Sequence, residues 1–198
     1  SGLSASINSQ TNATCFGQST GTATIAGSGT GGYTYSINGT TFLASGTFSN
    51  LAAGSYTLTV KDQNNCTATK ALTITQPTQL TISATSTGTT CGSSNGTITA
   101  TGNGGTGSLT YSIDGTTFQA SANFSSLASG GYTVTVKDAN SCTATTTVTV
   151  ASQSSLAASI TSQTNVNCYG QSTGSVTVAG SGSSGYTYAK DGTTFQAS

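Results

Sequence analysis

A fixed internal repeat constrains the fold of this chain more than any other sequence feature. Residues 51–74, LAAGSYTLTVKDQNNCTATKALTI, return 76 residues later as 127–150, LASGGYTVTVKDANSCTATTTVTV. Single residues recur at intervals of 76 to 77, in the series Cys15, Cys91 and Cys168, the series Tyr35, Tyr111 and Tyr188, and the series Phe42, Phe118 and Phe195. Self-similarity at a fixed period takes precedence over length when domains are counted. The sequence therefore predicts a tandem array of small units.

Three units follow from this period. We expect β-sandwich repeats at residues 1–79 and 80–155, and an incomplete third repeat at 156–198 that lacks its last strands. The junctions at 75–79 and 151–155 are short, so we expect the repeats to be arranged as a rod. Without its closing strands the third repeat would leave core positions exposed. We therefore expect the 198 residues to be one segment of a longer repetitive polymer. Whether a neighbouring chain could complete the third repeat stays open.

Alternating residues within each unit predict an all-β fold. Thr alternates with apolar residues, as around Ala23 and Ile25 and around Leu58 and Val60, which is typical of half-buried strands. About seven short strands per unit favour an immunoglobulin-like β-sandwich. Asn38-Gly39 predicts a tight hairpin turn. The motif Leu-x-x-Gly-x-Tyr predicts a tyrosine corner, whose hydroxyl bonds back to the backbone, at two positions: Tyr56 and Tyr132.

The cysteine spacing indicates disulfides and an oxidising compartment. Cys15 and Cys66 are 51 positions apart, and so are Cys91 and Cys142. One pair per repeat predicts the bonds Cys15–Cys66 and Cys91–Cys142. The partner of Cys168 would lie near position 219, outside the sequence. Buried free thiols are the alternative interpretation.

Composition excludes several classes of function. The chain has no His, Arg or Glu, and its four Lys balance its four Asp. An enzyme is not expected, because general acid–base catalysis needs a titratable group with a suitable partner. With zero net charge the chain lacks the excess of basic side chains that binds the phosphates of nucleic acid. No apolar run is long enough for a transmembrane segment. A mature secreted protein would also lack a signal peptide, as this sequence does.

The few charged residues are assigned to turns. Asp62 and Asp138 occupy equivalent turns, and Asp114 and Asp191 occupy Asp-Gly turns, where Asp commonly bonds its own backbone. One carboxylate per turn argues against calcium, which seeks six to eight oxygens, so neither a metal site nor a cofactor is predicted. An isopeptide crosslink at Lys61 or Lys137 is disfavoured because each neighbouring Asp would point to the opposite face of the strand.

Two loops carry a family resemblance. Cys15-Phe-Gly-Gln-Ser-Thr-Gly21 and Cys168-Tyr-Gly-Gln-Ser-Thr-Gly174 are each followed by a Gly-rich turn and Tyr-Thr-Tyr. They resemble the SprB-type repeats of gliding-motility adhesins, and the resemblance extends through Cys66 to Gln76-Pro77. The second repeat departs from it, since its Cys91 loop is one residue shorter and lacks the aromatic residue. The resemblance implies a large secreted protein displayed on the cell surface, without enzymatic activity in the repeat.

These observations predict an extracellular structural repeat protein that forms a surface filament or adhesin stalk. Uncharged, Thr-rich faces offer little repulsion between copies, so the expected partner is the chain itself, assembled end to end or laterally. The alternative is an adhesin module that binds glycans or another surface. Two aromatic side chains in loops would contact that ligand, Phe16 and Tyr169, but the favoured interpretation is that they cap the core. Ice binding would need a flat array of Thr, which a twisted sandwich rarely gives.

Overall fold

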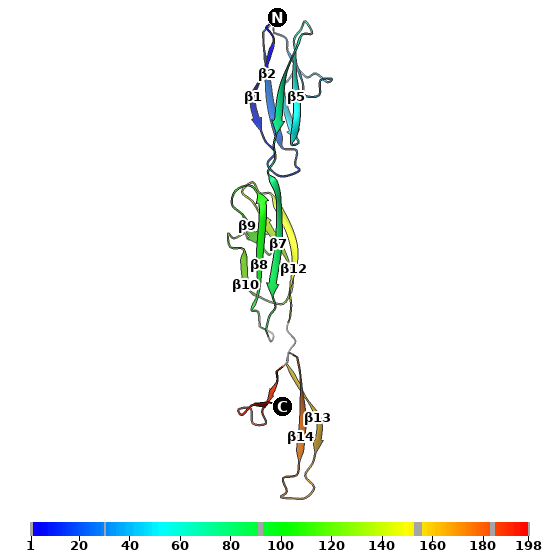
Figure 1. Cartoon of the computed structure of the whole chain (residues 1–198), viewed down its shortest axis with the longest axis vertical. Helices are drawn as coiled ribbons and strands as arrows, with labels where there is room; N and C mark the ends of the chain where they lie inside the picture. The colour runs from blue at the N-terminus through cyan, green and yellow to red at the C-terminus, as the bar shows by residue number, and fades with distance from the viewer. Residues whose placement is uncertain (1, 30, 91–92, 153–155, 183–184, 198) are drawn as a thin grey trace. The chain divides into compact units, whose positions relative to one another are not determined.

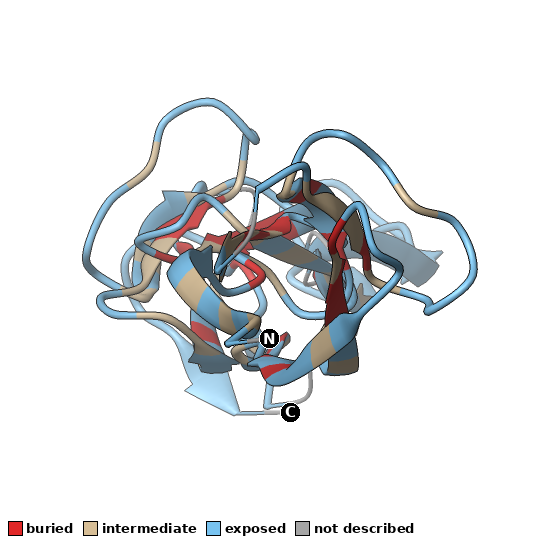
Figure 2. Ribbon diagram, turned by 90° about the horizontal axis from the view of Figure 1, so that it is seen from above, coloured by how far each residue is buried: buried red, intermediate tan, exposed pale blue. Residues whose placement is uncertain are grey.

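The regular structure of the chain is entirely β-strand. The computed structural model describes residues 2–29, 31–90, 93–152, 156–182 and 185–197, and no helix occurs among them (Figure 1). The expectation of an all-β fold is confirmed. Buried residues lie mainly on the strands, whereas the long projecting loops are exposed or half-buried (Figure 2).

Repeat 1 contains two three-stranded sheets, ordered β1-β2-β4 and β3-β5-β6, and every pairing is antiparallel. Six strands form it within the described residues, where the sequence predicted about seven: β1 Ser4–Thr11, β2 Gly21–Ser28, β3 Thr34–Ser36, β4 Thr47–Leu51, β5 Gly54–Lys61 and β6 Thr67–Ile74. Strand β1 pairs with β2 along its whole length, with a bulge between Ile7 and Ser9.

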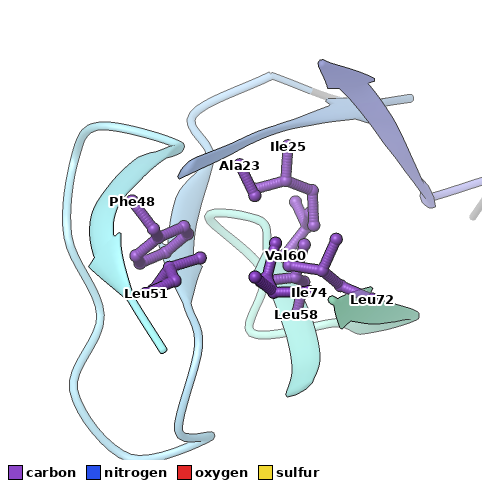
Figure 3. Packing of buried hydrophobic residues seen from close by; sticks show 8 residues of the cluster. All are labelled: Ala23, Ile25, Phe48, Leu51, Leu58, Val60, Leu72 and Ile74. Carbon is purple, nitrogen blue, oxygen red and sulfur yellow. The ribbon is translucent and has the colours of Figure 1, made fainter. Parts of the chain in front are cut away.

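The facing sides of these two sheets form the core of repeat 1. Ala23, Ile25, Phe48 and Leu51 from β2 and β4 meet Leu58, Val60, Leu72 and Ile74 from β5 and β6 (Figure 3). Each of the eight is at most 8% exposed. Outward Thr residues alternate with them, because successive side chains on a strand point to opposite faces. The apolar alternation in the sequence therefore located the core correctly.

The Asn38-Gly39 turn differs from the predicted tight hairpin. Tyr35 and Leu43 exchange both backbone hydrogen bonds at 2.8 Å, so residues 36–42 form the loop between them. The Asn38 Oδ1 atom accepts hydrogen bonds from the amides of Thr40 and Thr41 at 3.0 and 2.9 Å. Because the Asn side chain binds the following backbone itself, the chain forms a wider loop than a two-residue turn.

Repeat 2 has the same strand order as repeat 1. Its sheets are β10-β8-β7 and β12-β11-β9, equivalent to β4-β2-β1 and β6-β5-β3. The strands are β7 Thr78–Thr87, β8 Gly96–Gly105, β9 Thr110–Ser112, β10 Asn123–Leu127, β11 Gly130–Lys137 and β12 Thr143–Val150. Five equivalents of the eight core residues of repeat 1 are buried, each at most 4% exposed: Ile98, Ala100, Val134, Val136 and Val150. The other three, Phe124, Leu127 and Val148, are half-buried.

Residue contacts divide the chain into two compact units that do not follow the repeats. One unit contains residues 1–83, 101–121 and 134–146, and the other contains 84–100, 122–133 and 147–198. The boundaries at 79 and 155 stay predictions, and residues 153–155 lie outside the described residues.

Repeat 3 contains two strand pairs, β13 Ala157–Thr164 with β14 Ser175–Ser181, and β15 Thr187–Tyr188 with β16 Gln196–Ala197. The β13–β14 pair has the register of β1–β2, including the bulge, here between Ile160 and Ser162. Val176 and Val178 are 59% and 38% exposed, whereas the equivalent Ala23 and Ile25 of repeat 1 are 0% and 2% exposed. These two inward positions of repeat 3 are therefore exposed.

Gly21 allows the two sheets of repeat 1 to approach closely. A Cβ at this position would lie 2.7 Å from Ile74 Cγ2 and 2.9 Å from the Leu51 carbonyl oxygen. At the equivalent Gly96, an added Cβ would clash with Val150 Cγ1. Glycine normally weakens a strand, so its presence here reflects the narrow spacing between the sheets.

Gly21→Ala is expected to lower the free energy of unfolding by about 1 to 3 kcal/mol through overpacking, although Ala is less flexible than Gly. Gly131→Ala is the matched control, because a Cβ there meets nothing within 4 Å. Urea unfolding of both variants measures the difference. Equal stability of the two variants would contradict the close approach.

Candidate functional site

The two cysteines of repeat 1 lie at opposite ends of its sandwich. We call the end where β1 begins the amino pole and the end where β6 finishes the carboxyl pole. Cys66 directly precedes Thr67, the first residue of β6. The Cys15 loop binds the far end of β6, since Ala13 N donates to Thr75 O at 2.9 Å and Gly17 N donates to Gln76 Oε1 at 2.7 Å.

This separation makes the predicted Cys15–Cys66 bond wrong. Strand β6 has eight residues, which span about 26 Å at roughly 3.3 Å per residue. Two cysteines can be bridged only when their Cα atoms are within about 7 Å. The pairing of cysteines 51 positions apart therefore has no geometric basis in this fold.

Cys15 is bonded instead to Cys142, at a Cα–Cα distance of 5.7 Å and a sequence separation of 127. Both residues belong to the same compact unit. The predicted Cys91–Cys142 bond is also wrong, because the Cys142 sulfur is already bonded; Cys91 itself lies outside the described residues. Cys66 and Cys168 are free thiols and both are exposed. The disulfide joins the carboxyl-pole loop of repeat 1 to the turn between β11 and β12 of repeat 2.

The turn that presents Cys142 is organised by Asp138. The Asp138 Oδ1 atom accepts hydrogen bonds from the amides of Asn140 and Cys142 at 2.9 and 2.8 Å, and Oδ2 accepts one from Thr106 N at 2.8 Å. Ser141 adopts a left-handed φ of 66°. The Asn140 side chain donates to the Thr14 carbonyl oxygen at 3.1 Å. This turn therefore holds the Cys15 loop by a hydrogen bond as well as by the disulfide.

The loop that presents Cys15 is closed by threonine. Thr14 N donates to Thr20 Oγ1 at 2.8 Å, Gln18 N donates to the Cys15 carbonyl oxygen at 3.2 Å, and Gly17 has a φ of 74°. In repeat 2 the Thr90 amide instead donates to Asn95 Oδ1 at 2.9 Å. The shorter Cys91 loop is therefore closed differently, although Cys91 and Gly92 are outside the described residues.

A polar cleft of about 410 Å³ borders the disulfide. Its lining includes Phe16, Gln18, Gln79 and Asn140. Phe16 is 47% exposed and its counterpart Tyr169 is fully exposed. Neither ring is buried as a core cap would be, so the capping interpretation is not supported in the described structure. Contact of these rings with a ligand stays a prediction.

All four carboxylates accept hydrogen bonds within turns. Asp62 Oδ1 accepts from the amides of Asn64 and Cys66, each at 2.9 Å, and Oδ2 has no partner among the described residues. The amides of Thr117 and Thr116, followed by the Ser112 hydroxyl, lower the pKa of Asp114 well below its ordinary value. The amides of Thr194 and Thr193 lower the pKa of Asp191 to about 2. Within the described residues no three His, Cys, Asp or Glu side chains gather as metal ligands would.

Lysine and tyrosine side chains near the turns also have defined contacts. Lys61 Nζ lies 4.1 Å from the centre of the Phe42 ring, and Lys137 Nζ lies 3.7 Å from that of Phe118, distances typical of cation–π contacts. The Tyr56 hydroxyl donates to the Ala52 carbonyl at 2.9 Å, and Tyr132 makes the same bond to Ala128 at 3.0 Å. The hydrogen bond expected of a tyrosine corner is thus present in repeats 1 and 2.

A comparison with protein families covers the segment from β1 to the loop after β3, which includes Cys15. Residues 7–42 match the SprB repeat. The resemblance expected from the Cys15 loop is confirmed for this segment, which indicates an extracellular repeat protein of the gliding-motility adhesin type. A search of curated proteins found no match to the chain. Among the residues described, no helix is long and apolar enough to cross a membrane.

The disulfide can be tested by alkylating the unreduced protein with iodoacetamide and mapping its peptides by mass spectrometry. Cys66 and Cys168 are expected to be modified, and Cys15 and Cys142 are expected in one cross-linked peptide that reduction separates. A peptide that joins Cys15 to Cys66 would refute the assignment.

Asp114→Asn is expected to reduce the acid sensitivity of the fold. The folded-state pKa of Asp114 lies below the ordinary value of 3.8, so the unfolded chain binds the proton more tightly. The carboxylate therefore stabilises the fold above about pH 4, and this contribution is lost as the pH falls through the folded-state pKa. Asn38 forms the same turn in repeat 1, so the variant should fold. Urea midpoints at neutral and acid pH, compared with those of the unmodified chain, measure the change; an equal acid-induced loss in both proteins would contradict it.

Proposed function

We propose that this chain is part of a non-catalytic extracellular protein that forms a surface filament or adhesin stalk, in which β-sandwich repeats transmit tension. The observation that carries the proposal is the Cys15–Cys142 disulfide between consecutive repeats. The link lies outside both sandwich cores. When the chain is pulled it carries the force directly from Cys15 to Cys142, so that the whole segment between them, including the junction at residues 75–79, is not extended.

The first and last strands of repeat 1 are suited to bear such tension. Gln10 Nε2 donates to Thr73 O at 3.2 Å, Thr75 N donates to Asn12 Oδ1 at 3.0 Å, and Ala13 N donates to Thr75 O at 2.9 Å. The two strands run in the same direction, since residue numbers increase together along both. Once the disulfide is reduced, force applied to the two ends of the chain therefore loads these bonds in shear, so that they must break together and not one after another. While the disulfide is intact, the force passes from Cys15 to Cys142 and does not reach β6.

Repeat 2 has the same arrangement near the end of its last strand. Ser86 Oγ donates to Thr149 O at 2.7 Å, and Thr89 N donates to Ala151 O at 2.9 Å. Thr89 and Ser152 form a parallel bridge. Recurrence of the parallel contact supports a mechanical role common to the repeats.

Single-molecule stretching of the chain from its two ends tests the proposal. The disulfide should exclude the segment between its cysteines, whose sequence separation is 127, from extension. Unfolding of this segment is expected to show force peaks after reduction. Reduction should then add about 42 to 46 nm of contour length, at roughly 3.3 to 3.6 Å per residue. The double variant Cys15→Ser/Cys142→Ser is the control and should show the full length without reductant. Extension without force peaks would contradict a stalk function.

The alternative is a module that binds glycans, and it is favoured by the exposed rings of Phe16 and Tyr169. Exposed aromatic side chains at loops can stack on sugar rings. A glycan array probed with the chain and with the variant Phe16→Ala/Tyr169→Ala tests it. Binding that the variant loses would support the alternative, and the absence of binding by the unmodified chain would count against it.

A further inference from the structure

We propose that Asn38 is a site of spontaneous covalent modification, at which the side-chain amide is lost as ammonia and the 36–42 loop of repeat 1 acquires an aspartate. The reaction is an attack by the next backbone nitrogen on the Asn side chain, and Gly39 leaves that nitrogen unhindered. Asn-Gly occurs three times in the chain, at Asn38, Asn95 and Asn103. The surroundings of the three pairs differ, and they favour the reaction at Asn38.

Three hydrogen-bond donors converge on the Oδ1 atom of Asn38. The amides of Thr40 and Thr41 lie 3.0 and 2.9 Å from it. The Ser36 hydroxyl lies 3.0 Å from it. Attack on the side-chain carbonyl carbon moves negative charge onto this oxygen, so the donors are placed as in an oxyanion hole. Hydrogen bonds to an ionised oxygen are about twice as strong as those to a neutral one, and the loop therefore stabilises the tetrahedral intermediate more than the starting amide.

The equivalent loop of repeat 2 holds a negative charge at the same atom. Asp114 Oδ1 accepts hydrogen bonds from the amides of Thr116 and Thr117 at 2.8 and 2.7 Å. It also accepts one from the Ser112 hydroxyl at 2.7 Å. These amides, followed by the hydroxyl, hold the pKa of Asp114 well below its ordinary value. A loop of this construction thus favours an anion at the position of Asn38 Oδ1.

The nucleophile and the leaving group are both accessible at Asn38. Asn38 and Gly39 are exposed, and a Cβ at Gly39 would meet nothing within 4 Å. Within the part of the chain that the structure describes, neither Gly39 N nor Asn38 Nδ2 donates a hydrogen bond. The peptide between the two residues lies outside the strands, in the 36–42 loop. It can therefore turn toward the side chain without breaking a sheet.

Asn95 is held in the opposite direction. Its Nδ2 atom donates to Thr90 Oγ1 at 2.7 Å, and its Oδ1 atom accepts from Thr90 N at 2.9 Å. Gly96, which would supply the attacking nitrogen, is buried at the start of β8 and pairs with Leu127 of β10. The Asn95 side chain therefore points back along the chain, and the strand holds the peptide that would have to turn.

Asn103 has neither the donors nor the freedom of Asn38. It lies within β8, and no donor among the described residues binds its Oδ1 atom. Gly104 packs against the neighbouring chain so closely that an added Cβ would clash with the Gln79 carbonyl oxygen. Asn103 is exposed, so it serves as an internal control for exposure without an oxyanion hole.

The reaction needs only water. Gly39 N gives up its proton and attacks Cγ of Asn38, and the intramolecular attack is aided by proximity. The Gly39 N–Cγ bond forms, the Cγ–Nδ2 bond breaks, and Nδ2 takes up a proton and leaves as ammonia, which closes a succinimide ring. Water then opens the ring. Addition of water at Cγ gives an aspartyl residue at position 38, and addition at the backbone carbonyl gives an isoaspartyl residue.

The aspartyl product does not return to the ring at neutral pH. An Asp-Gly pair closes the same ring mainly when its carboxyl group is protonated, because a carboxylate is a poor electrophile. The pKa of Asp114 lies below its ordinary value, and the amides of Thr194 and Thr193 lower the pKa of Asp191 to about 2. Conversion of Asn38 therefore gives repeat 1 the Asp-Gly turn of the other repeats, and the net charge changes from zero to −1.

Incubation of the full chain at neutral pH, with and without urea, tests the proposal. Peptide mapping by mass spectrometry is expected to show amide-to-acid exchange at Asn38 in the folded chain, well ahead of Asn95 and Asn103, with release of ammonia. In urea the three sites should react at similar rates, and Asn38 should react more slowly than in the folded chain. Folded-state rates that are equal at Asn38 and Asn103, or faster reaction of Asn38 after unfolding, would overturn the inference.

Ser36→Ala tests the oxyanion hole directly. Loss of the hydroxyl donor, about 1 kcal/mol, corresponds to roughly fivefold slower exchange at Asn38. Ser112→Ala is the matched control, because Ser36 and Ser112 are equivalent and both fully buried. It should destabilise the chain to the same extent and leave the Asn38 rate unchanged. An Asn38 rate in Ser36→Ala equal to that of the unmodified chain would contradict the role of the loop, and urea midpoints of both variants show that they are folded.

Discussion

The direction of three strands decides how this chain is crosslinked. From the Cys15 loop, β2 runs from the carboxyl pole to the amino pole, β4 runs back, and β5 returns to the amino pole, where the turn with Cys66 follows. An odd number of crossings separates the two cysteines of a repeat, so they lie at opposite poles. A disulfide between these two cysteines of one repeat is therefore excluded, and the observed Cys15–Cys142 bond joins a loop of one repeat to a turn of another.

The sandwich of repeat 1 depends on narrow spacing between the apolar inner faces of its two sheets. Gly21 lets Ile74 approach the start of β2, and eight apolar side chains fill the space between the sheets. Such a core was predictable, because the alternation of Thr with Ala, Ile, Leu and Val fixes which residues face inward. The period also gave the equivalence of the repeats, so that the burial of Val134 and Val136 follows from that of Leu58 and Val60.

The disulfide was not predictable from spacing alone. A separation of 51 positions recurs in both full repeats, but it says nothing of which pole each cysteine occupies. The number of strands that run from pole to pole between Cys15 and Cys66 shows that the two cysteines cannot be bonded. That number depends on the direction of the short strand β4, whose register with β2 shifts between Gly21 and Ala23. The 36–42 loop was missed for a related reason, since Asn38 uses its side-chain oxygen to organise the chain instead of forming a two-residue turn.

The two bonded cysteines lie in different hydrogen-bonding environments. The loop around Cys15 is closed by Thr20 and offers a backbone carbonyl, whereas the turn around Cys142 is closed by Asp138 and offers the Asn140 amide. In the observed contact the Asn140 side chain of the turn donates to the Thr14 carbonyl oxygen of the loop. The hydrogen bond therefore joins the same loop and the same turn as the disulfide.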